Sequence, residues 1–279
     1  MRGRSGARRL TDIFAGQGAD SEALAEIYDL EHDDRADDLV FYREFARRSS
    51  GAILDLGTGS GRLLHALVAG SEHRVLGVDP SPALLARARR RIAAHPVLGA
   101  AARAGRLKVA LGDAERIARS EQFGLVVACD VIPHLSGAEA AEQMLRSIAR
   151  HVTPAGRVVL DLAGPAAIPH HDLGRDLDWE RRVDGTRYRR WSELRRETAD
   201  GVVVMLSTIT ERESADGTIA RLPAAFRLWY PDRGLLERVI ARAGLVVSAL
   251  YGSHELDDFG PRSERLIAVS ERPGRHRIG

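Results

Sequence analysis

Short apolar runs alternate with amphipathic segments through the first 163 residues of the chain. Continuous runs of Val, Ile and Leu predict strands buried on both faces, and apolar residues at helical spacing predict helices between them. Strands that alternate with helices form parallel sheets covered by helices. The predicted strands are residues 53–56, 74–78, 107–111, 125–129 and 157–162. We therefore expect an α/β fold with a doubly wound, Rossmann-like and mostly parallel sheet.

The alternating pattern stops after Ala163 and returns after Tyr230. Residues 164–180 lack periodicity and contain glycine, proline and histidine, which predicts a loop. Strand-like segments follow at 188–195, 202–211 and 219–230, separated by the turn signals Asp200-Gly201 and Asp216-Gly217. We expect an antiparallel insertion here. A helix at 234–243 and strands at 245–250 and 265–269 then complete the core.

These patterns divide the chain into five segments. Helices at 21–30 and 33–48 precede the first strand, with Leu39, Phe41 and Phe45 on an apolar face. The expected segments are a flexible basic tail (1–20), the α/β core with its N-terminal helices (21–163), the antiparallel insertion (164–230), the return of the core sheet (231–271) and a C-terminal tail (272–279).

Composition narrows the class of protein. Hydrophobic residues make up 44% of the 279 residues, and 41 basic side chains nearly balance 39 acidic ones. A net charge of +2 argues against a nucleic-acid binder that depends on phosphate contacts. Cys129 is the single cysteine, so no intrachain disulfide forms, and no apolar run approaches the roughly 20 residues of a membrane span. We expect a cytoplasmic protein that does not bind membranes.

The sequence Ile53-Leu-Asp-Leu-Gly-Thr-Gly-Ser-Gly-Arg62 carries the first chemical signal. A strand that ends in a glycine-rich turn before a helix offers backbone N–H groups and an open surface to a nucleoside. The dinucleotide motif needs a glycine where this chain has Arg62. Asp79 ends the second strand, 18 residues after Gly61, close to where acidic residues bind ribose hydroxyls. The pattern favours a nucleoside over a dinucleotide.

At these residues the chain resembles the class I S-adenosylmethionine-dependent methyltransferases. The motifs are the glycine turn, Asp79, Gly112-Asp113-Ala114 after the third strand, and the segment from Cys129 to Leu135 after the fourth. The resemblance implies a seven-stranded sheet with an antiparallel last strand, and an inserted antiparallel β lid over the acceptor pocket. It also implies S-adenosyl-L-methionine as cofactor and S-adenosyl-L-homocysteine as product.

The resemblance also suggests roles for individual residues. Asp79 would accept the ribose hydroxyls, and Asp113 would face the adenine amino group. Asp55 would orient the amino acid end of the cofactor, or only brace the glycine turn. Tyr28 would fold over the cofactor, or only pack its helix on the core. The expected cofactor contacts are Tyr28, Asp55, Gly57, Thr58, Gly59, Gly61, Asp79, Pro80, Asp113, Ala114, Asp130 and Val131.

Candidates for catalysis and acceptor binding are fewer. His134 follows the fourth strand and could act as a general base, because an unperturbed histidine titrates near pH 6.5; it could instead cap a helix or line the cofactor pocket. Neighbouring His170 and His171 do not form a recognisable metal-ligand set, so we expect no metal. Aromatic residues of the insertion could line the acceptor pocket or form its own core. The expected acceptor contacts are His170, Trp179, Tyr188, Trp191, Arg227 and Trp229.

The function expected from this resemblance is methyl transfer to nitrogen or oxygen of a small-molecule acceptor in specialised metabolism. One alternative is a protein that binds S-adenosylmethionine but catalyses a non-methylating reaction such as cyclisation. Another alternative is a nucleic-acid methyltransferase. Members of that class that methylate amino groups carry Asn/Asp-Pro-Pro-aromatic after the fourth strand. This chain has Asp130-Val131-Ile132-Pro133 there, which argues against that alternative. Nucleic acid is therefore not the expected partner. Insertions of this kind often pair, so a homodimer fits the resemblance.

Overall fold

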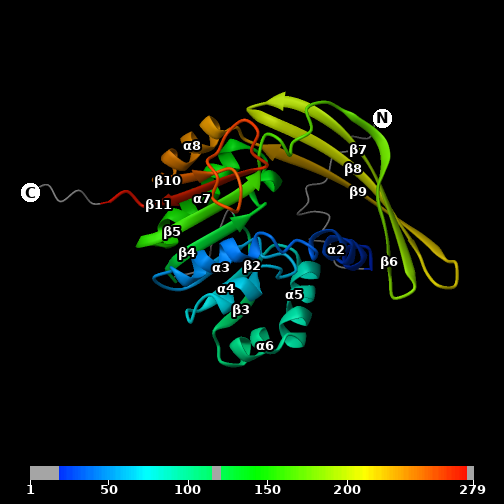
Figure 1. Cartoon of the computed structure of the whole chain (residues 1–279), viewed down its shortest axis with the longest axis horizontal. Helices are drawn as coiled ribbons and strands as arrows, with labels where there is room; N and C mark the ends of the chain where they lie inside the picture. The colour runs from blue at the N-terminus through cyan, green and yellow to red at the C-terminus, as the bar shows by residue number, and fades with distance from the viewer. Residues whose placement is uncertain (1–18, 115–120, 275–279) are drawn as a thin grey trace, which may run out of the picture.

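The computed structural model describes residues 19–114 and 121–274, which form two sheets (Figure 1). The larger sheet has seven strands in the order β10-β11-β5-β4-β1-β2-β3. Strands β1 to β5 are parallel, and β11 is antiparallel to both β5 and β10. The strands are β1 (Ile53–Leu56), β2 (Val75–Asp79), β3 (Leu107–Leu111), β4 (Phe123–Cys129), β5 (Val152–Ala163), β10 (Val246–Tyr251) and β11 (Arg265–Glu271). The predicted fold class is confirmed.

Helices cover both faces of this sheet because its strands are apolar on both sides. Along β1, Leu54 and Leu56 pack into one buried cluster with α7 and α8, whereas Ile53 packs into the other with α3, α4 and α6. Alternate side chains of a strand point to opposite faces, so this one short strand contributes side chains to both buried clusters. The helices are α2 (Ala19–His32), α3 (Leu39–Arg47), α4 (Leu64–Ala69), α5 (Pro82–Ala94), α6 (Pro96–Arg103), the 3₁₀ turn η1 (Ile132–His134), α7 (Ala138–His151) and α8 (Arg233–Arg242).

The smaller sheet is inserted between β5 and α8. Its strands are β6 (Leu173–Val183), β7 (Thr186–Ala199), β8 (Gly201–Glu213) and β9 (Ile219–Tyr230), and each is antiparallel to the next. Figure 1 shows these long strands reaching past α2. We call this sheet the lid. Its position brings one of its faces toward the carboxyl ends of the parallel strands.

Two element predictions differ from the structure. Residues 164–180 were expected to form a loop, but Leu173–Val183 is the edge strand β6. Most of its side chains are exposed, so no alternation of apolar and polar residues marks it, and pairing with β7 supplies its order. The second helix begins at Leu39 rather than Asp33. Acidic side chains before Leu39 bind arginines elsewhere in the fold, as Asp38 does with Arg62.

Some predictions fall outside the described residues. The expected basic tail lies mostly within residues 1–18, and part of the C-terminal tail lies within 275–279. Within the described part of the chain, no helix combines the length and apolar character needed to cross a bilayer. No group of three or more His, Cys, Asp or Glu side chains within that part is arranged to hold a metal ion.

Candidate active site

The turn between β1 and α4 has a backbone that only glycine accommodates well. Gly57 has a φ of +72°, and a Cβ there would lie 2.4 Å from Cγ2 of Val131. Gly61 has a φ of +84°, and a Cβ there would lie 2.8 Å from Leu64 and 3.3 Å from Ala88. Gly57 therefore lets the side chain of Val131, which lines the cavity, pack directly on the turn. Gly61 instead allows the turn to pack against α4 and α5.

Two carboxylates hold this turn from below. Asp79 accepts hydrogen bonds from the backbone N–H of Gly59 at 2.9 Å and of Ser81 at 2.8 Å. Asp55 accepts a hydrogen bond from Oγ1 of Thr58 at 2.6 Å. Burial raises the pKa of each carboxyl to about 6, so both are mainly ionised at neutral pH. Asp55 braces the turn, whereas Asp79 also borders the cavity above it.

A cavity of about 840 Å³ lies between this turn and the lid. Its volume is within the roughly 300–1,000 Å³ of small-molecule sites. Asp55 and Gly61 do not line it, in agreement with their bracing and packing contacts. The predicted cofactor and catalytic residues that line it are Tyr28, Gly57, Thr58, Gly59, Asp79, Pro80, Asp113, Ala114, Asp130, Val131 and His134.

The inner face of the lid forms the other wall of the same cavity. In register, Leu206 pairs with Phe226, and Thr208 pairs with Ala224, so these side chains share one face of the sheet. That face combines apolar and hydroxyl side chains with two arginines. Its cavity-lining members are Trp179, Arg181, Arg190, Leu206, Thr208, Thr210, Ala224, Phe226, Leu228 and Tyr230.

Of the predicted acceptor residues, Trp179 alone is among those lining the cavity. Trp229 is 2% exposed and packs in the core, where its indole N–H donates to the carbonyl of Asp200. Tyr188 is also buried, and its hydroxyl donates to Oε1 of Glu26 at 2.7 Å. Strand alternation explains the error for Trp229, because Tyr230 beside it points to the opposite face and lines the cavity.

Three further residues that were predicted to contact the acceptor also do not line the cavity. Trp191 lies on the outer face of the lid, where the guanidinium of Arg189 lies 5.6 Å from the centre of its ring. Arg227 is exposed and donates to the carbonyl of Ser136 at 3.2 Å. His170 is exposed on the loop before β6 and does not line the cavity. None of these three side chains is among those that line the cavity.

Helix α2 lies between the lid and the glycine turn. Arg190 of the lid pairs with Glu31, and Arg181 donates to the carbonyl of Leu30 and to Asp34. Burial lowers the pKa of Arg190 to about 10, which still leaves it charged at neutral pH. On the same helix, the hydroxyl of Tyr28 lies 3.2 Å from the position of a Cβ on Gly59. Tyr28 therefore lies over the predicted cofactor surface.

A buried polar network, of which the sequence analysis identified only Asp130, reaches the cavity through Asp130 and Arg265. Asp161, which is 1% exposed, accepts hydrogen bonds from Tyr42, from Nε of Arg265 at 2.7 Å and from Nε2 of His254 at 2.8 Å. Arg265 also donates from Nη2 to Oδ1 of Asp130 at 2.9 Å. Asp130 has a φ of +52°, which costs a non-glycine residue roughly 1–3 kcal/mol and is typical of functional sites.

His134 lies in η1, beside Asp130 at the edge of the cavity. Desolvation by the surrounding protein lowers its pKa below the ordinary value, the carboxylate of Asp130 opposes this shift and His32 adds to it. The His134 side chain is itself exposed, so contact with solvent limits the shift. Burial lowers the pKa of His32 as well. Both imidazoles are therefore neutral at neutral pH and can accept a hydrogen bond from an N–H or O–H group of a ligand.

The network makes stability depend on pH through His254. Burial alone would lower its pKa, but the hydrogen bond and charge of Asp161 raise it above the ordinary value of 6.5. The stabilisation that charged His254 contributes is therefore complete below the pKa of this histidine in the unfolded chain. It is lost as the pH rises through the pKa of His254 in the folded protein. We expect His254→Gln to destabilise the protein more at about pH 5.5 than at about pH 8.5 in urea unfolding. An equal loss at both pH values would contradict a charged His254.

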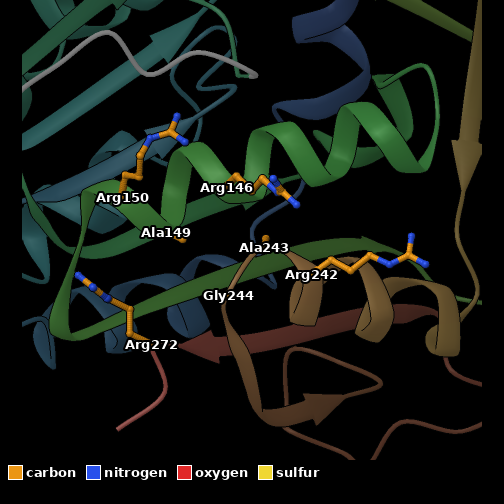
Figure 2. Close-up of a pocket in the computed structure, with 7 residues that line it drawn as sticks. All are labelled: Arg146, Ala149, Arg150, Arg242, Ala243, Gly244 and Arg272. Carbon is orange, nitrogen blue, oxygen red and sulfur yellow. The ribbon is translucent and has the colours of Figure 1, made fainter. Parts of the chain in front are cut away.

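A second hollow, of about 720 Å³, lies at the opposite edge of the large sheet (Figure 2). It lies where α7 and α8 end and where β11 leaves the sheet. Four arginines line it, with small residues between them, and its lining contains no carboxylate or histidine. It offers no group for acid–base chemistry and is not a candidate active site. The residues are Arg146, Ala149, Arg150, Arg242, Ala243, Gly244 and Arg272.

Known proteins share this architecture. Residues 53–156 match the family model described as “Methyltransferase domain”. No curated protein sequence is significantly similar to the chain. A solved S-adenosylmethionine-dependent methyltransferase from Clostridium acetobutylicum is 16% identical, with a TM-score of 0.71 over 90% of this chain and 98% of its own.

Two further solved structures cover nearly all of the chain. KedS8, a sugar N-methyltransferase from Streptoalloteichus, is 21% identical, with a TM-score of 0.68 over 98% of this chain and 99% of its own. CalS10, an amino pentose methyltransferase from Micromonospora echinaspora solved with S-adenosylmethionine bound, is 20% identical, with a TM-score of 0.66 over 92% of this chain and 100% of its own. At these identities the structures establish a common fold.

The matched segment contains the glycine turn, Asp79, Asp113 and Asp130, which are the residues on which the sequence resemblance rests. Asp79, Asp113, Asp130 and Gly57 to Gly59 of the turn line one cavity, whose volume is within the range of small-molecule sites. The predicted resemblance and enzyme class are confirmed: the chain carries a methyltransferase domain at residues 53–156 and has the fold of solved S-adenosylmethionine-dependent methyltransferases, one of them with S-adenosylmethionine bound.

Proposed function

We propose that this protein transfers a methyl group from S-adenosylmethionine to a nitrogen or oxygen atom of a small-molecule acceptor in a biosynthetic pathway. One observation carries the proposal. The cavity that begins at Asp79 and the glycine turn continues without a break to Trp179 and Phe226 on the lid. A cofactor bound by Asp79 and the glycine turn would leave the part of the cavity beside the lid free for an acceptor.

The chain's residues would divide the work of binding and orientation. S-adenosylmethionine supplies a methyl group that is already activated by its sulfonium. Asp79 would bind the ribose hydroxyls while it holds Gly59, and Asp113 would bind the adenine amino group. The lid and α2 exclude water from the acceptor. Orientation of reacting groups can lower a barrier by about 7–11 kcal/mol, so close positioning accounts for most of the catalysis expected here.

The charges in the cavity favour nitrogen as the acceptor atom. The lowered pKa values of His134 and His32 weaken both as bases for a hydroxyl group, although each imidazole is neutral and can accept a proton. An amine needs no base before it attacks, provided that it is neutral. The carboxylate of Asp130 can bind its N–H group at the edge of the cavity. We therefore propose an amine as the acceptor.

The comparisons support a small acceptor. KedS8 is described as a sugar N-methyltransferase and CalS10 as an amino pentose methyltransferase, and both are similar to this chain over the lid as well as the core. We also propose that the protein is cytoplasmic, since Cys129 is a free thiol, and that it forms a homodimer, as the family resemblance suggests. Size-exclusion chromatography with light scattering would test the homodimer directly.

The proposed transfer is tested by methyl incorporation. The protein is incubated with S-adenosylmethionine labelled in its methyl group and with separate panels of small amines and small alcohols. We expect label in a product of the amine panel, with one S-adenosylhomocysteine formed per methyl group. A Phe226→Ala variant should bind S-adenosylhomocysteine normally but transfer more slowly, because Phe226 lies on the lid side. Cofactor consumption without labelled acceptor would favour a non-methylating reaction instead.

A further inference from the structure

Among the described residues, Asp130 is the one carboxylate that both lines the cavity and joins the buried network of Asp161 and Arg265. Its Oδ1 accepts from Arg265, while Oδ2 has a single partner among the described residues, the Sγ of Cys129 at 4.0 Å. The side chain is 38% exposed, and this exposure opens into the cavity. One oxygen is thus fixed by the protein, and the other has no N–H or O–H donor within the described part of the chain.

The groups facing Asp130 come from several elements around the cavity. Burial raises the pKa of Tyr28 on α2 and of Tyr230 on β9, and the charge of Asp130 adds to both shifts; the same charge opposes the lowering of the pKa of His134. Tyr28 also lies over Gly59, where the cofactor is expected. Asp130 therefore lies between the cofactor surface and the inner face of the lid. Under the proposed function, this is the place where the acceptor atom would meet the methyl group.

Arg265 holds Asp130 in this position from behind. It begins β11 and lies between two carboxylates, with Nη2 2.9 Å from Oδ1 of Asp130 and 2.6 Å from Oδ1 of the buried Asp161. Asp161 also fixes the backbone of Asp130, because the N–H of Asp130 donates to the carbonyl of Asp161 at 2.7 Å. Both the main chain and the side chain of Asp130 are thus tied to the end of β5.

We propose that Arg265, anchored by Asp161, is a positioning residue that aims the carboxylate of Asp130 at the acceptor's N–H group beside the transferring methyl group. This inference rests on the proposed function. In the transfer, the nitrogen lone pair forms the new N–C bond, the electron pair of the S–C bond stays on sulfur, and the methylated ammonium later loses its proton to solvent. Asp130 orients the nitrogen and is not consumed.

Sinefungin tests this placement without knowledge of the acceptor. In this analogue a carbon that bears an amino group replaces the sulfonium and its methyl group, so its amine occupies the place where methyl transfer occurs. S-adenosylhomocysteine has the same nucleoside and amino acid ends but no such amine. The ratio of their dissociation constants therefore measures the contact with that amine and cancels general effects on cofactor binding.

We expect wild-type protein to prefer sinefungin in calorimetric titrations. Asp130→Asn should lower this preference about tenfold, because the negative charge that attracts the amino group of sinefungin is lost; the ratio to S-adenosylhomocysteine removes any general effect on cofactor binding. Arg265→Lys keeps a positive charge beside Asp161 but cannot hold both carboxylates, so it should lower the preference about threefold or more. The exposed Asp258→Asn serves as the matched control and should leave the ratio unchanged.

Each result has a distinct meaning. An unchanged ratio in Asp130→Asn would overturn the placement of Asp130. A lowered ratio in Asp130→Asn with an unchanged ratio in Arg265→Lys would overturn the role of Arg265. If Arg265→Lys does not fold, as judged by thermal melting, Asp161→Asn takes its place, because it weakens the anchor of Arg265 and keeps an acceptor for Tyr42; it should lower the ratio in the same direction, and the Asp130 variant still decides the first point. Failure of wild-type protein to bind either compound would refute the proposed function instead.

Discussion

Replacement of Asp79 by alanine is expected to weaken the binding of S-adenosylhomocysteine at least about 100-fold. Asp79 would accept two hydrogen bonds from the ribose, each worth roughly 1.5–3 kcal/mol when the acceptor is charged. It also holds the N–H of Gly59 at 2.9 Å, so the variant loses both a ligand contact and the shape of the turn. Isothermal titration of the variant and of wild-type protein measures the change.

Asp79→Asn separates these two contributions. The asparagine oxygen can still accept from Gly59, but the negative charge is gone, so we expect an intermediate loss. The exposed Asp258→Asn should bind as wild type does. A dissociation constant of Asp79→Ala within about threefold of wild type would show that Asp79 does not bind the cofactor.

Removal of Asp161 is expected to have the largest effect on stability. Asp161→Ala leaves Arg265 partly unpaired in a buried site and deprives Tyr42 and His254 of their partner. Breaking a buried ion pair from one side costs roughly 3–5 kcal/mol. Urea unfolding of the variant and of wild-type protein at neutral pH would give the difference in the free energy of unfolding.

Tyr42→Phe provides a milder variant in the same network. It removes one hydrogen bond to Asp161 and should cost about 1 kcal/mol, because the carboxylate keeps Arg265 and His254. Losses below about 1 kcal/mol for Asp161→Ala would mean that the network does not stabilise the fold. A Tyr42→Phe variant that loses as much as Asp161→Ala would mean that the hydroxyl, rather than the ion pair, dominates.

Local patterns explain why the core and the cofactor surface could be predicted from the sequence. The strand from Ile53 to Leu56 and the glycine turn after it are adjacent in the chain, so their geometry follows from their residue types. Parallel strands then bring Asp79, Asp113 and Asp130 to one edge of the sheet. No long-range pairing had to be known in advance.

The lid and the buried network around Asp161 depend on contacts that a single sequence does not reveal. Trp229 and Tyr230 are neighbours of similar character, and only the register with β8 shows which of them faces the cavity. Asp161 lies 93 residues from His254 and 104 from Arg265, so no local spacing links them. A charged residue inside the apolar run of β5 was the one available signal. Asp161 within Val-Val-Leu-Asp-Leu requires buried partners.

The crystal structure of the protein with S-adenosylhomocysteine would test the central claim most directly. We expect the ribose against Asp79, the adenine beside Asp113, and the sulfur facing Asp130 and the inner face of the lid. The space between the sulfur and Phe226 should remain open for an acceptor. A cofactor bound elsewhere, or one whose sulfur faces away from the lid, would contradict methyl transfer in this cavity.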